Sequence, residues 1–260
     1  MRAVVKTVAW WLIAAIVLVV FIARERGEIL HAVTAMRTAS PGWLALALAG
    51  GLLLQALLAL TFRPLLRRVG SPISVRVLLD AQMQRLVIGT VVPAGAAAAV
   101  YAGVRRLGRA GVSTDDALFV ALVNSALGYA SFITVLLPAL AVIGVSGRLS
   151  GLILFGAAAM LLLVIVLSGG LILLLRGSRA SEGLLSRLPS HRIADRLRQF
   201  VVQARQHGLR PRDLVAPFAI NLSIEVDGIL TLFACLRAVG WRSSWQEALV
   251  GYGVGTLFLL

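Results

Sequence analysis

Long apolar runs separated by short arginine-rich segments set the hydrophobic pattern of this chain. A helix needs roughly 20 apolar residues to cross the hydrocarbon core of a bilayer, and six of the runs approach or exceed that length. The first run lacks a small-residue cleavage site, so we expect a retained span and not a signal peptide. The predicted spans are residues 7–23, 43–62, 115–137, 149–175, 214–236 and 244–260.

A further segment, residues 75–110, is apolar but interrupted. Its first half, VRVLLDAQMQRLVIGTVV, carries Asp80 and Arg85, and Pro93 then precedes a run of small residues, AGAAAAVYAGV. Proline breaks a helix because it lacks the amide donor, and irregular backbone at membrane depth needs shielding by protein. We therefore predict a Pro/Gly-broken helical hairpin, or re-entrant pair, that enters and leaves the membrane on one side.

Composition assigns the chain to one class. Of its 260 residues, 59% are hydrophobic and 14% are charged, which predicts an all-α, polytopic transmembrane helical bundle forming a single domain over residues 1–260. A net charge of +14 would suggest nucleic acid in a soluble chain, but here the arginines fall between apolar runs. Cys235 is the only cysteine and the three histidines are scattered. We expect no nucleic-acid partner, no metal and no cofactor.

The distribution of basic residues predicts an orientation. With a cytoplasmic N-terminus and a hairpin that returns to its own side, 18 of the 25 lysines and arginines lie inside and 6 lie outside. The inner side then includes an Arg-rich loop, residues 176–213, in which residues 191–207 have an amphipathic helical pattern. That helix either lies in the membrane interface or packs on the bundle as a solvated linker. We expect a multi-pass protein of the inner (plasma) membrane.

Two carboxylates stand inside an apolar run, in NLSIEVDGIL, residues 221–230. A charge at the bilayer centre costs about 2.5 kcal/mol or more. On a helix, Asn221 and Glu225 share one face while Asp227 lies nearly opposite. Neighbouring helices must therefore enclose this segment, or it opens onto a polar cavity, or the helix unwinds near Gly228. Each carboxylate either bonds to a neighbouring helix and serves packing, or lines a cavity for a headgroup or protons. In the second case, Arg85 is the expected partner of Glu225.

Other polar positions give weaker signals. Gln82 and Gln84 point to different faces of their helix, so at most one lines a cavity with Arg85. Tyr101 and Arg105 follow the hairpin and can contact a lipid phosphate, although anchoring of the topology explains the arginine equally well. A stripe of small residues at Asn124, Gly128 and Ser131 is more typical of helix packing than of a site.

The order of these features resembles the flippase-like family, the lysylphosphatidylglycerol synthase transmembrane region. The resemblance is carried by residues 65–117, where a polar-studded helix leads into Pro-x-Gly, small residues and a basic Gly-rich link, and by residues 217–255. Where members of this family tend to have a charged pair in the next helix, this chain has Asn124 and Ser125. The 260 residues include no soluble aminoacyl-transfer domain, so the resemblance covers the membrane part only.

The resemblance implies a non-enzymatic protein that binds or translocates a phospholipid or glycolipid headgroup across the inner membrane. Its expected partners are membrane lipids, anionic ones in particular. One alternative is a membrane subunit that recruits a soluble or membrane enzyme for lipid modification or glycosyl transfer, and another is a scaffold without transport. The headgroup-binding residues that we expect are Arg85, Tyr101, Arg105, Asn221, Glu225 and Asp227.

Overall fold

A computed structural model describes residues 27, 34, 37–91, 95–145, 151, 155–162, 165 and 210–259. The predicted span at 7–23, most of that at 149–175 and the amphipathic segment at 191–207 lie outside the described residues.

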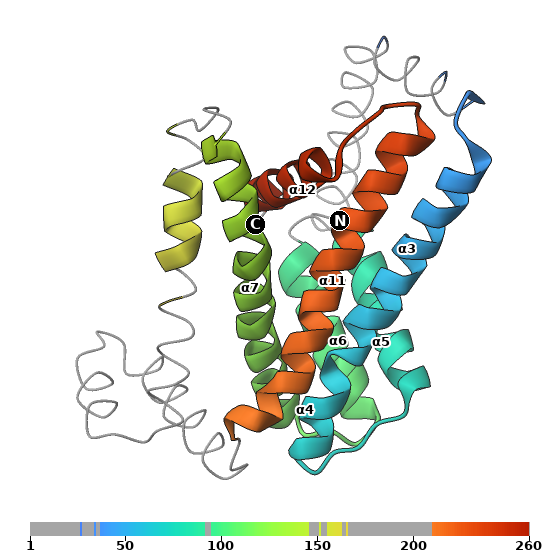
Figure 1. The fold of residues 1–260 in the computed structure, drawn as a ribbon. Helices are drawn as coiled ribbons and strands as arrows, with labels where there is room; N and C mark the ends of the chain where they lie inside the picture. Colours follow the sequence, from blue (N-terminus) through green and yellow to red (C-terminus); the bar gives the residue numbers. More distant parts are fainter. Residues whose placement is uncertain are drawn as a thin grey trace, which may run out of the picture.

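The described residues are helical and contain no strand, which confirms the all-α class (Figure 1). Three helical stretches within this part of the chain are long and apolar enough to cross a membrane: Pro41–Arg68, Thr114–Val145 and Arg212–Ala238. α12 has 15 residues, or about 22 Å at 1.5 Å per residue, so the predicted span at 244–260 is not among them. The total of six spans stays a prediction. The helices are α3 (Pro41–Leu60), α4 (Phe62–Arg68), α5 (Val75–Val91), α6 (Gly95–Arg109), α7 (Thr114–Val145), α11 (Pro211–Ala238) and α12 (Trp245–Leu259).

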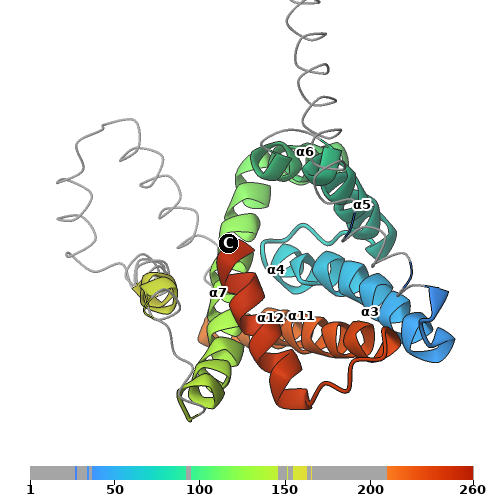
Figure 2. The same ribbon diagram turned by 90° about the horizontal axis from the view of Figure 1, so that it is seen from above.

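Five of these helices form a ring when the bundle is viewed along its axis (Figure 2). Contacts join α3 to α11, α11 to α7, α7 to α6, α6 to α5 and α5 back to α3, while α4 contacts four members of the ring. α3 and α11 run antiparallel, because the Ser40 N–H at the start of α3 donates to the Ala238 carbonyl at the end of α11 (2.9 Å). α12 crosses from the far end of α11 to α7 (Figure 1).

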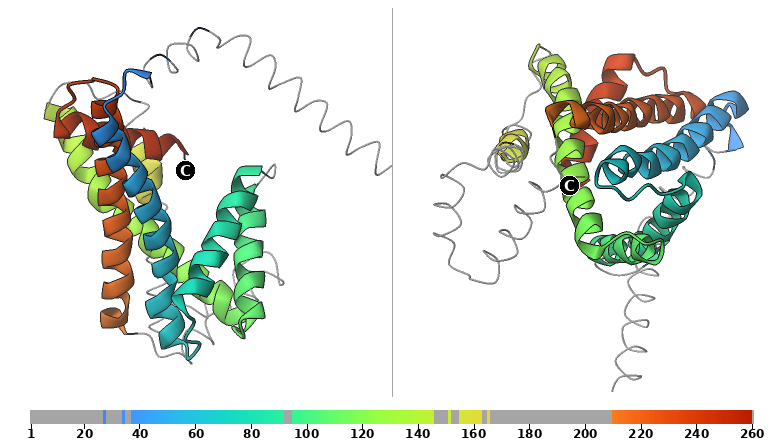
Figure 3. Two further views of the ribbon diagram at one scale, coloured as in Figure 1. Left: turned by 90° about the vertical axis from the view of Figure 1, so that its right-hand side faces the viewer. Right: turned by 90° about the horizontal axis from the view of Figure 1, so that it is seen from below.

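The helical hairpin is present at the predicted place as the pair α5 and α6, while its entry into the membrane from one side stays a prediction. Its two arms pack along each other, and Figure 3 (left) shows them rising side by side from one end of the bundle. At the base, Arg106 Nε donates to Asp80 Oδ2 over 2.6 Å and ties the end of α6 to the start of α5. Residues 92–94, which include Pro93, lie outside the described residues. Gly111 (φ 93°) then ends the second arm in a left-handed conformation that a side chain would disfavour.

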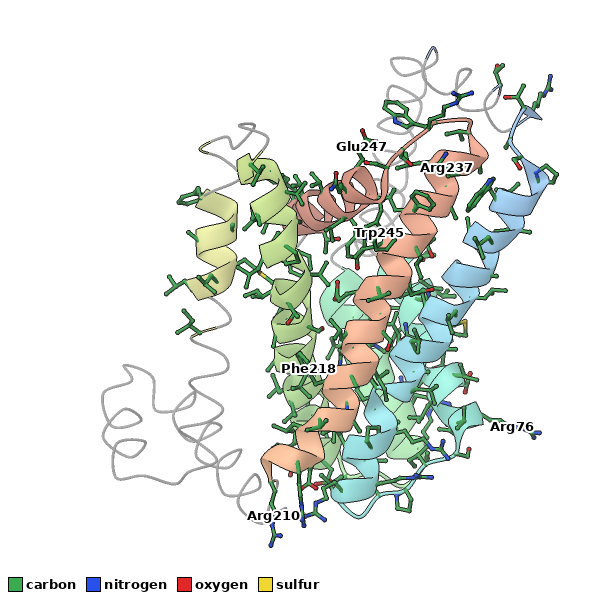
Figure 4. All side chains as sticks on the ribbon, in the orientation of Figure 1. Arg76, Arg210, Phe218, Arg237, Trp245 and Glu247 are labelled. Atoms are coloured by element: carbon green, nitrogen blue, oxygen red, sulfur yellow. The ribbon has the colours of Figure 1, made fainter. Side chains whose placement is uncertain are left out.

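Arginines gather where α4 and α6 end and where α5 and α11 begin, and we call this the basic end. Figure 4 places Arg76 and Arg210 there, with Arg237 and Glu247 at the opposite end. Arg68 Nε lies 3.1 Å from Asp213 Oδ2, which joins the end of α4 to the start of α11. A core of buried residues fills the bundle next to the basic end, including Leu65, Leu66, Leu78, Leu107, Phe119, Val120 and Val123.

Candidate functional site: a pocket beside the hairpin

A cavity of about 190 Å³ lies between the hairpin, the junction of α3 with α4, and the first half of α7. Its walls are largely apolar, with polar side chains at four positions. We call it the hairpin pocket. It is lined by Ala59, Phe62, Leu78, Ala81, Gln82, Arg85, Val100, Gly103, Val104, Leu107, Ala117, Leu118, Ala121, Leu122, Asn124 and Ser125.

Among the described residues that line the pocket, Arg85 is the only one with a charged side chain. Its guanidinium carbon lies 5.4 Å from the centre of the Phe62 ring, a cation–π arrangement. Its Nε is buried and has no hydrogen-bond partner among the described residues. Gly103 on the other arm makes room for it, since a Cβ atom there would lie 2.7 Å from Arg85 Cδ. The hairpin therefore holds a guanidinium group at the pocket whose buried Nε donor bonds to no described residue.

Amide side chains connect the pocket to the rest of the ring. Gln82 Nε2 donates to Gln55 Oε1 of α3 over 3.1 Å. Asn221 Nδ2 of α11 donates to Asn124 Oδ1 over 3.1 Å and to the Pro217 carbonyl over 2.9 Å. Because Asn124 also lines the pocket, α11 reaches the pocket through this amide pair.

Of the two glutamines on α5, only Gln82 lines the pocket, in agreement with their placement on different faces. Gln84 Nε2 instead donates to Asp80 Oδ1 over 3.3 Å. Within the small-residue stripe on α7, Gly128 packs against α11, because a Cβ atom there would touch Asn221 Oδ1 at 3.4 Å, whereas Asn124 lines the pocket.

Glu225 bonds to α12 and not to the hairpin. The Tyr252 hydroxyl donates to Glu225 Oε2 over 2.9 Å, and the tyrosine lies so close to Gly228 that a Cβ atom there would be 2.7 Å from its oxygen. The predicted pair of Glu225 with Arg85 is therefore wrong. Its physical cause is the ring order of the helices, in which α5 and α11 are not neighbours and share no contact.

Asp227 faces α3 on the other side of α11. Its side chain is 7% exposed, and Oδ1 lies 3.5 Å from the position of a Cβ atom built on Gly50. Glu225 is 9% exposed. The expectation that neighbouring helices enclose both faces of this segment is confirmed, with α12 covering one carboxylate and α3 the other.

The predicted site residues thus occupy three places. Arg85 lines the hairpin pocket and Asn221 lies one hydrogen bond away from it. Glu225 and Asp227 lie in the contacts of α11 with α12 and α3. Tyr101 is 67% exposed, Arg105 is also exposed, and neither lines the pocket.

Sequence reasoning missed several contributors to these places. Gln55 carried a signal, because it is a lone amide in the apolar run 43–62. Phe62, Gly103 and Tyr252 carried none, since an aromatic residue or a glycine in an apolar run is ordinary. Their roles depend on which helices become neighbours.

The fold and the pocket define a class: a helical membrane protein whose bundle includes a helical hairpin, α5 and α6. Within this class, the family model for the lysylphosphatidylglycerol synthase TM region matches residues 8–260. The chain belongs to this family. No curated protein and no solved structure matches it.

Proposed function

We propose that this protein binds the anionic headgroup of a membrane lipid in the hairpin pocket and moves it between leaflets, without catalysing a reaction. The single observation that carries the proposal is Arg85, a guanidinium group on the pocket wall with no hydrogen bond or ion pair to any described residue. Arginine is well suited to phosphate because its planar fork donates two parallel hydrogen bonds to two phosphate oxygens.

The remaining pocket wall fits the other parts of a lipid. A headgroup cannot enter hydrocarbon without compensating polar contacts, and Gln82, Asn124 and Ser125 offer donors and acceptors beside Arg85. The apolar walls, with Leu118 and Leu122 among them, suit the glycerol and the first carbons of an acyl chain. An anionic lipid whose headgroup also carries hydroxyl or amine groups therefore matches the pocket better than a purely apolar ligand.

We further propose that the basic end faces the cytoplasm in the inner membrane, with the N-terminus on the same side. The support is the positive-inside rule, applied to the arginines that gather at that end (Figure 4). In this orientation the hairpin pocket draws its lipid from the cytoplasmic half of the bilayer, because the hairpin enters from the basic end.

A proteoliposome assay tests the proposal. The fraction of labelled anionic lipid that a membrane-impermeant reagent can reach should rise faster with wild-type protein than in empty liposomes. Arg85→Ala should slow this movement roughly tenfold or more, because a hydrogen bond to a charged group contributes about 1.5–3 kcal/mol. Arg76→Ala is the matched control, since Arg76 lies on the same helix but is exposed at the basic end.

Two outcomes would contradict the proposal. In the first, the wild-type protein moves none of several anionic lipids faster than empty liposomes do. The protein would then not translocate lipid on its own, and recruitment of a partner enzyme would be favoured. Equal slowing by Arg76→Ala and Arg85→Ala would show that general positive charge, and not the pocket, attracts the lipid.

A further inference from the structure

The contact between α3 and the middle of α11 holds polar groups that have no partner among the described residues. A Cβ atom at Gly50 would overlap the Thr231 side chain, so the two helices approach closely at this point. Asp227 Oδ2 and Thr231 Oγ1 are both buried there, and neither has a hydrogen-bond partner among the described residues. The two side chains lie one helical turn apart on the same face of α11. One carboxyl oxygen and one hydroxyl group are therefore enclosed together, and neither bonds to a described residue.

No described cation lies within ion-pair distance of this carboxyl group. α3 carries no titratable residue. From α12, Tyr252 donates its hydrogen to Glu225, and Tyr129 of α7 packs in a separate cluster with Phe132. The other charged residues of the helices packed on α11 lie toward helix ends: Arg63, Arg67, Arg68, Asp115, Asp116, Arg212, Asp213, Arg237 and Glu247.

Electrostatics decides between the two states that this carboxyl group can adopt. An ionised carboxylate would be a buried charge without a counter-ion, which costs several kcal/mol even after relaxation of the surroundings. A proton removes that charge and gives the acid an O–H donor, for which Thr231 Oγ1 is an acceptor one turn away. Glu225, two residues earlier, differs because it already accepts a hydrogen bond from Tyr252.

We propose that Asp227 is a proton-binding site, protonated while α3 and α11 are in contact and deprotonated when the contact loosens. Uptake transfers one proton from a hydronium ion to a carboxylate oxygen and leaves water, and release reverses this step. The packed bundle then holds a proton that the loosened bundle lacks, so the stabilisation is present at low pH and is lost as the pH rises. In a protein that moves lipid, a proton gradient would act through this site, and that use alone rests on the function proposed above.

Infrared spectra of the purified protein in lipid nanodiscs test the site. At neutral pH the wild type should show the carbonyl band of a protonated carboxyl group. Asp227→Asn should lose that band, while Glu225→Gln, which removes the other carboxylate buried in α11, should keep it. The unfolding temperature of the wild type should also fall as the pH is raised, and Asp227→Asn, neutral at every pH, should show a smaller fall.

Either of two results would overturn the site. The first is a wild-type spectrum at neutral pH with no band that depends on Asp227. The second is an unfolding temperature that follows sodium concentration and not pH, because the carboxylate would then be ionised and hold a cation. A failure of the wild type to move lipid leaves both readouts unaffected, so it would count against the proposed function and not against the site.

Discussion

The hairpin pocket and the contacts of α11 both bury polar groups inside the bundle, but they differ in the space around those groups. In the pocket, Arg85 borders a cavity of about 190 Å³. In the α11 contacts, Gly50 and Gly228 leave no room for a Cβ atom against α3 and α12. Three predicted site residues are divided between these regions, with Arg85 in the first and Glu225 and Asp227 in the second.

This difference separates two uses of polar groups within a membrane protein. An unpaired cation beside free space can meet a ligand, so the pocket is suited to binding. Carboxyl groups enclosed by close helix packing can accept only what a neighbouring helix or a proton supplies, so the α11 contacts are suited to holding the helices together. The difference is one of packing, and substitutions that add or remove single atoms can test it.

The largest effect on stability is expected at Gly228. Gly228→Ala places a methyl group against Tyr252, and overpacking of this kind costs about 1–3 kcal/mol. Displacing the tyrosine also leaves Glu225 without its donor, which adds about 1–3 kcal/mol. Gly255→Ala is the matched control, because a Cβ atom at this helical position meets nothing within 4 Å. Reversible unfolding in detergent or bicelles measures both, and equal stabilities would show that the α11 contacts are not tightly packed.

A smaller loss is expected for Tyr252→Phe. It removes one hydroxyl group and leaves the buried Glu225 oxygen unpaired, at a cost of about 1–3 kcal/mol. Tyr101→Phe should leave the free energy of unfolding unchanged, since Tyr101 is 67% exposed.

Double substitutions test which residue Glu225 contacts. Combining Glu225→Gln with Tyr252→Phe should lower the free energy of unfolding by less than the sum of the two single losses, whereas the losses of Glu225→Gln and Arg85→Gln should add. Losses that do not add for Glu225→Gln and Arg85→Gln would indicate that these two residues interact, which contradicts the structure.

The smallest effect on stability is expected for filling the pocket. Ala121→Leu adds three carbons where the cavity has room, and leucine and alanine are both good helix formers. We expect a change in unfolding free energy of about 0.5 kcal/mol or less, as for surface substitutions, together with a marked loss of lipid movement. A loss of stability as large as that of Gly228→Ala would mean that the two regions do not differ in packing.

The sequence predicted the helices well and their pairing poorly. The runs at 43–62, 115–137 and 214–236 correspond to α3, α7 and α11, and the break at Pro93 predicted the hairpin. The predicted run stops just before Pro138, but α7 continues through this proline to Val145. Membrane helices tolerate prolines because neighbouring groups satisfy the freed backbone. Hydrophobic periodicity assigns a residue to a helix face but does not say which helix lies opposite. The neighbours of Glu225 and Arg85, which are Tyr252 of α12 and Phe62 of α4, are therefore known only from the arrangement of the helices in the structure.

The most direct test of the central claim, that the hairpin pocket binds an anionic headgroup at Arg85, is site-specific thiol protection. Ser125→Cys in a Cys235→Ala background places one cysteine on the pocket wall, and Ser125 is exposed there. Nanodiscs with anionic lipid should slow its modification by a thiol reagent relative to zwitterionic nanodiscs. Adding Arg85→Ala should abolish that difference, while adding Arg76→Ala should preserve it. Modification at the same rate in both lipids, or protection that survives Arg85→Ala, would contradict the account.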